Sequence, residues 1–71
     1  METLRIIEAI IAEKRSRNEF PDVASRYEVL RRGGTNDELW KLEEQGLVRK
    51  GRMINDDYFL ITEYNEVNSR M

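Results

Sequence analysis

Gly46 marks the point where the hydrophobic pattern of the chain changes from helical spacing to the composition of strands. Before it, residues 36–45 place Leu39 and Leu42 on one helix face, with charged side chains on the opposite face. After it, residues 47–54 and 58–62 are rich in Val, Ile, Tyr, Phe and Thr, which favour strands. The sequence therefore predicts a helix that ends at Gly46 and leads directly into a β-hairpin.

The turn of this hairpin is predicted at Asn55, Asp56 and Asp57, because Asn and Asp favour turns. A second register turns earlier, at Lys50 and Gly51, and produces a three-stranded meander. Gly51 is equally consistent with a bulge inside one longer strand. The later turn is the preferred interpretation, and the earlier one stays open.

The first helix is predicted over residues 2–16, where apolar side chains recur at helical spacing. The stripe consists of Leu4, Ile7 and Ile11, and it is widened by Ile6 and Ile10. This is more than one core face usually needs. The additional isoleucines fit either a larger core or a second face for a partner.

Residues 20–22, which include Pro21, are typical of a helix entry and predict a second helix over Asp22–Arg31. Gly33 and Gly34 end this helix, because glycine tolerates the left-handed conformation that closes helices. Thr35, with Glu38 three residues later, is a capping box. It opens a third helix over Asn36–Gln45.

The chain of 71 residues is the size of one small domain, predicted over residues 1–66, with 67–71 as a frayed tail. A domain of this size buries only about 60% of the surface that its unfolded chain exposes. Because so thin a core is marginal, we expect a symmetric homodimer with Ile6 or Ile10 in the contact. Val67 is the next candidate if the first helix is buried within one chain.

The sequence contains neither cysteine nor histidine. Disulfides, zinc fingers and Cys-His or Ser-His catalytic arrangements are therefore excluded, and no glycine-rich phosphate loop is present. We expect no enzyme activity, no metal and no small-molecule cofactor. No stretch approaches the roughly 20 apolar residues that cross a bilayer, so we expect a cytoplasmic protein without a membrane partner.

The centre of the core is predicted to contain Leu39, Leu42, Leu47 and Ile61, packed against the stripe of the first helix. Trp40 lies on the flank of the third helix. A tryptophan in so small a domain is more often packed than displayed. We therefore expect Trp40 to be buried or half-buried, with stacking on a base or partner as the alternative.

The segments LWKLEEQGLVRKG, residues 39–51, and YFLIT, residues 58–62, resemble the recognition helix and wing of MarR and PadR transcriptional regulators. The matching positions are Leu39, Leu42, Glu43, Gly46, Leu47, Val48, Arg49 and Thr62. The resemblance implies a mostly α fold with a β-hairpin, a winged helix-turn-helix of three helices plus wing. It also implies binding of double-stranded DNA by a small bacterial or phage-type regulator.

A DNA-binding function requires cations for phosphates and donors for base edges. The candidate phosphate contacts are Arg31 and Arg32 at the end of the second helix and Arg49, Lys50 and Arg52 in the hairpin. Asn36 and Lys41 on the third helix are the candidates for base contacts, with adenine and guanine respectively. Alternation along a strand separates Arg49 from Lys50 and Arg52, so only part of the set shares a face.

The alternative function is a protein-interaction module without DNA binding. Residues 35–46 contain four carboxylates and one lysine, which gives a net charge of −3. This charge repels DNA and suits a basic protein partner. Both hypotheses follow from the same predicted fold, because a fold by itself does not fix a function.

Overall fold

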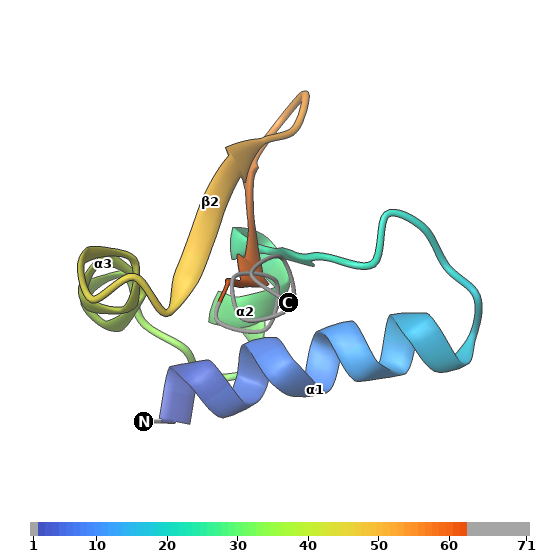
Figure 1. Ribbon diagram of the computed structural model, residues 1–71, viewed down its shortest axis with the longest axis horizontal. Helices are drawn as coiled ribbons and strands as arrows, with labels where there is room; N and C mark the ends of the chain where they lie inside the picture. Colours follow the sequence, from blue (N-terminus) through green and yellow to red (C-terminus); the bar gives the residue numbers. More distant parts are fainter. Residues whose placement is uncertain (1, 63–71) are drawn as a thin grey trace, which may run out of the picture.

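The computed structural model describes residues 2–62 and contains three helices and one antiparallel sheet of three short strands (Figure 1). The elements are α1 (Glu2–Ser16), β1 (Ala24–Ser25), α2 (Arg26–Arg31), α3 (Asn36–Glu44), β2 (Val48–Arg52) and β3 (Asp57–Ile61). The strand order is β1-β3-β2. The predicted domain end at residue 66, the frayed tail 67–71 and Val67 lie outside the described residues.

The predicted first and third helices are confirmed. Thr35 caps α3, and its hydroxyl accepts a hydrogen bond from the Glu38 amide at 3.2 Å. The Glu38 carboxylate does not complete the capping box, because it accepts instead from the amide and hydroxyl of Thr3. The Thr3 hydroxyl lowers the pKa of Glu38. This contact ties the start of α1 to the start of α3.

The predicted start of the second helix at Asp22 is wrong. Ala24 and Ser25 form β1, which pairs with Phe59 and Tyr58 of β3, and the helix begins only at Arg26. Ser25 and Glu28 form a complete capping box, in which each side chain bonds the other residue's amide. The structure thus combines three helices with a small three-stranded sheet, and the predicted hairpin is part of that sheet.

The predicted hairpin is present, and its turn lies near the later of the two positions, at residues 53–56, because Asp57 is already paired with Arg52. Lys50 and Gly51 are paired inside β2, so the earlier register is wrong. The turn is closed by the Met53 amide, which donates to the Asp56 carbonyl at 2.7 Å. Gly51 is opposite Tyr58, whose ring would lie 2.2 Å from a β-carbon at that position. Glycine at this point therefore leaves room for the Tyr58 ring across the strand pair and does not form a bulge.

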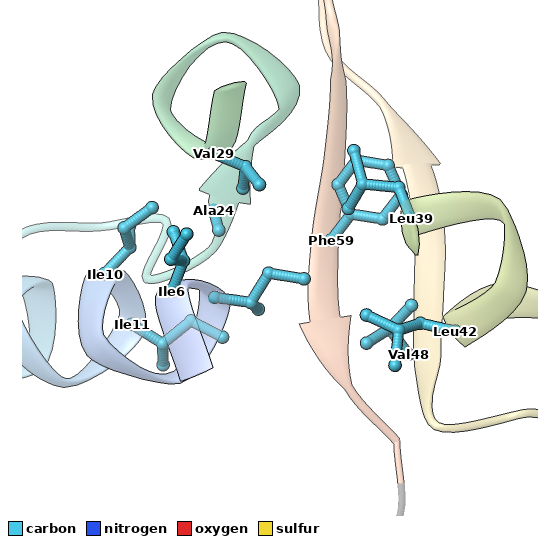
Figure 2. Packing of buried hydrophobic residues seen from close by; sticks show 10 residues of the cluster. Ile6, Ile10, Ile11, Ala24, Val29, Leu39, Leu42, Val48 and Phe59 are labelled. Atoms are coloured by element: carbon cyan, nitrogen blue, oxygen red, sulfur yellow. The ribbon is translucent and has the colours of Figure 1, made fainter. Parts of the chain in front are cut away.

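The core lies where α1, α2, α3 and the sheet meet (Figure 2). The predictions for Leu39 and Leu42 are confirmed, since both are buried. Leu47 and Ile61 are only partly buried and pack against the edge of the core, so their central placement is wrong. The fully buried side chains of the sheet side are instead Phe59 and Ala24. These residues lie where β1 pairs with β3, which the sequence reading did not anticipate.

The four isoleucines of α1 are all used by the core of the single chain. The helix lies along one side of the molecule and contacts α2, α3 and the sheet, so more than one of its faces is covered (Figure 1). Ile6 is 8% exposed and Ile10 is 1% exposed. Neither side chain offers surface to a second copy, because burial within one chain already accounts for the wide stripe.

The two glycines after α2 have different structural reasons. Gly33 has a φ of +102°, which is the left-handed conformation expected for a residue that ends a helix. Gly34 does not. A β-carbon at Gly34 would lie 2.5 Å from the Cγ1 atom of Val29, which is fully buried.

Gly34→Ala is therefore expected to destabilise the domain by about 1–3 kcal/mol, because a methyl group must be forced into a filled core. Urea denaturation followed by circular dichroism measures this change. The matched variant is Gly33→Ala, where the added β-carbon meets open space and only backbone strain is added. An m-value equal to that of the wild-type protein, with a lower urea midpoint, would support the packing explanation for Gly34→Ala. A midpoint unchanged from the wild type would contradict it.

Candidate nucleic-acid interface

The exposed face of α3 and the β2–β3 hairpin form the surface on which most of the predicted binding residues lie. α3 packs against β2, and the hairpin extends from there to a tip on the side away from α1 (Figure 1). Asn36 and Lys41 are exposed on α3, and Arg49, Lys50 and Arg52 are exposed on β2. The structure thus places five of the seven predicted contacts on two adjacent elements.

Strand alternation separates the three hairpin cations. Lys50 is opposite Phe59 and Arg52 is opposite Asp57, whereas Arg49 is opposite Leu60 on the other face of the sheet. Lys50 and Arg52 therefore share the face that carries the buried Phe59. Arg49 has no carboxylate partner among residues 2–62.

The ion pairs of Lys50 and Arg52 are long and exposed. The Lys50 ammonium is 3.9 Å from the Glu43 carboxylate, and the Arg52 Nε is 3.8 Å from the Asp57 carboxylate. The Arg52 side chain is 90% exposed. Exposed pairs of this kind stabilise a protein by about 0–1 kcal/mol. Both cations are thus available to an incoming anion at small cost.

The two arginines at the end of α2 have other contacts. Arg32 donates two hydrogen bonds to the Glu13 carboxylate of α1, at 3.0 and 2.8 Å, and these bonds lower the pKa of Glu13. The guanidinium of Arg32 is therefore directed toward α1. Arg31 is exposed, and its guanidinium lies 5.7 Å from the ring centre of Tyr27.

A small pocket of about 130 Å³ lies between α3, β2 and the start of α2. Its lining residues are Arg26, Asn36, Leu39, Trp40, Glu43, Lys50 and Phe59. Trp40 is 61% exposed beside this pocket, so the prediction that it is packed is wrong. The indole lies on the outer flank of α3, since Leu39 and Leu42 take the two positions that reach the core.

Arg26 is the member of this surface that the sequence reading missed. It forms an ion pair with Asp57, joining the start of α2 to the start of β3. Its Nε is buried and has no hydrogen-bond partner. The signal that locates it is the capping box of Ser25 and Glu28, which makes Arg26 the first residue of α2. Because the sequence pattern predicts a helix start at Asp22, it places Arg26 inside the helix and not at its first position.

Trp40→Ala is expected to lower the free energy of unfolding by less than about 1 kcal/mol, because the indole is mostly in solvent. Leu42→Ala, two positions along the same helix, is expected to cost about 2–5 kcal/mol, because Leu42 is fully buried. Chemical denaturation of the two variants provides the comparison. A larger loss for Trp40→Ala would contradict the orientation of α3.

The negative charge of α3 is partly compensated. The Glu38 carboxylate is bonded to Thr3, and Glu43 lies near Lys50. Asp37 and Glu44 are exposed, and neither forms an ion pair within the described part of the chain. The exposed face of α3 therefore presents two carboxylates together with Asn36, Lys41 and Trp40.

Comparison of the chain with protein-family models, with curated proteins and with solved structures finds no match. Within residues 2–62, no group of three or more Asp and Glu side chains is arranged to hold a metal ion. None of the helices in that range has the length and apolar composition needed to cross a membrane.

Proposed function

We propose that the chain is a winged helix-turn-helix domain that binds duplex DNA, with α3 as the recognition helix and the β2–β3 hairpin as the wing. The observation that carries this proposal is the position of two exposed cations, Lys50 and Arg52, on one face of β2, with Lys50 beside Glu43 of α3. A protein surface that faces a groove of DNA needs cations along its border, where the phosphates lie. The hairpin supplies that charge.

Each part of the surface has a separate role in the proposed complex. Lys50 and Arg52 bind phosphates, because DNA replaces weak pairs at 3.9 and 3.8 Å with stronger charge-assisted contacts. Asn36 and Lys41 reach base edges from α3, as an amide and an ammonium suited to adenine and guanine. Asp37 and Glu44 disfavour phosphate contacts along the rest of α3, which keeps nonspecific affinity low.

Arg32 contributes little to this function, because its guanidinium is already held by two hydrogen bonds to Glu13. Arg31 is not tied to a carboxylate in the described part of the chain, and it is the cation of α2 that could reach a phosphate. The number of phosphates contacted by one subunit is therefore small.

The experiment is a fluorescence-anisotropy titration of a labelled duplex at several salt concentrations, beginning near about 50 mM. With two or three phosphates neutralised, the logarithm of the binding constant is expected to fall by about 2–3 units for each tenfold increase in salt. Absence of binding at the lowest salt would overturn the proposal.

A second function, the binding of a basic protein, is favoured by one observation. Trp40 is 61% exposed beside the apolar pocket between α3 and β2. Exposed tryptophans next to pockets are frequent anchors in protein interfaces. If no DNA binds, a pull-down tests this function. Capture of a basic protein by the wild-type chain, with loss of capture in Trp40→Ala and in Glu44→Lys, would establish it.

A further inference from the structure

The tip of the hairpin carries two apolar side chains that the fold does not use. Ile54 is 98% exposed and Met53 is 39% exposed, in the turn between Arg52 and Asp57. The tip lies on the side of the molecule away from α1 (Figure 1). Nothing in residues 2–62 packs on Ile54, so its position is not explained by stability.

Asp56, in the same turn, and Asp57, which begins β3, are directed back toward the body of the protein. The Asp56 carboxylate accepts from the Tyr27 amide at 2.9 Å and from the Asp57 amide at 2.7 Å. Asp57 is paired with Arg26 of α2. The negative charges of the turn are thus held against α2 and do not extend beyond the tip.

The outermost groups of the turn are therefore the Arg52 guanidinium, the Met53 and Ile54 side chains and the amide of Asn55. In this set a cation and an amide flank two apolar side chains, and these three kinds of group are the ones that proteins use in the minor groove of DNA. Arginine and asparagine contact the floor and edges of that groove, and an apolar side chain enters between base pairs and unstacks them.

We propose that Ile54, supported by Met53, is an apolar wedge that inserts between base pairs in the minor groove and bends the DNA. This inference rests on the proposed DNA-binding function and specifies how the wing engages the duplex. It predicts a preference for pyrimidine–purine steps such as TA, because these steps unstack most easily. The preference of the protein for particular DNA sequences would then come partly from the deformability of the base-pair steps and not only from base contacts by Asn36 and Lys41.

The test uses the full chain and duplexes of about 30 base pairs that carry 2-aminopurine beside a central TA step. A second set carries a fluorophore at each end, so that energy transfer reports bending. The wild-type protein is expected to increase the 2-aminopurine fluorescence and to shorten the end-to-end distance. Ile54→Ala should reduce both signals several-fold, and Ile54→Phe should restore them.

Salt dependence separates the wedge from the phosphate contacts. Ile54→Ala should leave the salt slope unchanged, because an apolar side chain releases no counterions, whereas Arg52→Ala should reduce the slope by about 0.9. Phe20→Ala is the matched control, since Phe20 is 74% exposed in the loop before β1 and should alter none of these signals. Circular dichroism verifies that each variant is folded.

The possible failures are distinguishable. If the wild-type protein binds the duplex without any change in 2-aminopurine fluorescence or bending, the wedge is overturned and the DNA-binding function stands. Signals that persist at full size in Ile54→Ala overturn the wedge as well. If the wild-type protein binds no duplex at low salt, the proposed function itself is overturned.

Discussion

Phe59→Ala is expected to remove most of the stability of the domain. Phe59 is 1% exposed and lies at the middle of β3, which is the central strand of the sheet. It pairs with Ala24 on one side and Lys50 on the other, and its ring lies beside Leu39 of α3 (Figure 2). The ring therefore connects all three strands with the helical side of the core.

Truncation of a buried phenylalanine to alanine costs about 3–5 kcal/mol, since it removes apolar contacts and leaves a cavity. Native domains are stable by only about 5–15 kcal/mol, and a chain of this length lies at the lower end of that range. Differential scanning calorimetry is expected to show a melting temperature lower by roughly 15 °C or more.

The matched control is Leu60→Ala, because Leu60 neighbours Phe59 on the strand but faces the opposite side and is only partly buried. It is expected to lower the melting temperature clearly less than Phe59→Ala does. Equal losses for the two variants would contradict the assignment of the core to one face of the sheet.

The second large effect concerns binding. The double variant Lys50→Ala and Arg52→Ala is expected to weaken DNA binding roughly 100-fold near 50 mM salt, and to reduce the salt slope by about 1.8. The reason is that two phosphates are no longer neutralised. The loss should be similar for every duplex sequence, since phosphate contacts carry no sequence information. Anisotropy titrations over a range of salt concentrations measure both quantities.

Two control variants distinguish the loss of these phosphate contacts from a general loss of charge and from the loss of a base contact. Arg32→Ala removes one positive charge, from a side chain held by Glu13, and it should change the affinity little. Asn36→Ala removes no charge, so it should leave the salt slope unchanged and weaken only a preferred sequence. If Arg32→Ala weakened binding as much as the double variant, the interface would lie elsewhere.

Local signals explain why much of the fold was predictable from the sequence. The spacing of isoleucines gives α1, and the cap at Thr35 together with Leu39 and Leu42 gives α3. The β-rich segments on either side of a turn of Asn and Asp give the hairpin. In each case the determining residues lie within one or two turns of one another.

The missed elements depend on partners distant in the sequence. β1 has only two residues, and its partners Phe59 and Tyr58 follow more than thirty residues later. The capping box at Ser25 was nevertheless a local signal, and it would have placed the start of α2 correctly. Trp40 is exposed although tryptophan favours burial, since its place on α3 faces away from the core.

The candidate site was predicted in part for the same reasons. Strand alternation correctly separated Arg49 from Lys50 and Arg52. The sequence did not reveal that Arg32 is directed toward Glu13, nor that Arg26 and Asp57 connect α2 to the hairpin. These contacts join side chains brought together only by the packing of α1 and β3 around α2.

The most direct test of DNA binding by α3 and the wing is chemical-shift mapping of the ¹⁵N-labelled protein during titration with duplex DNA at low salt. We expect progressive changes at the amides of residues 36–41 and 49–55, with small changes along α1. The absence of any change at low salt, or changes confined to α1, would contradict it.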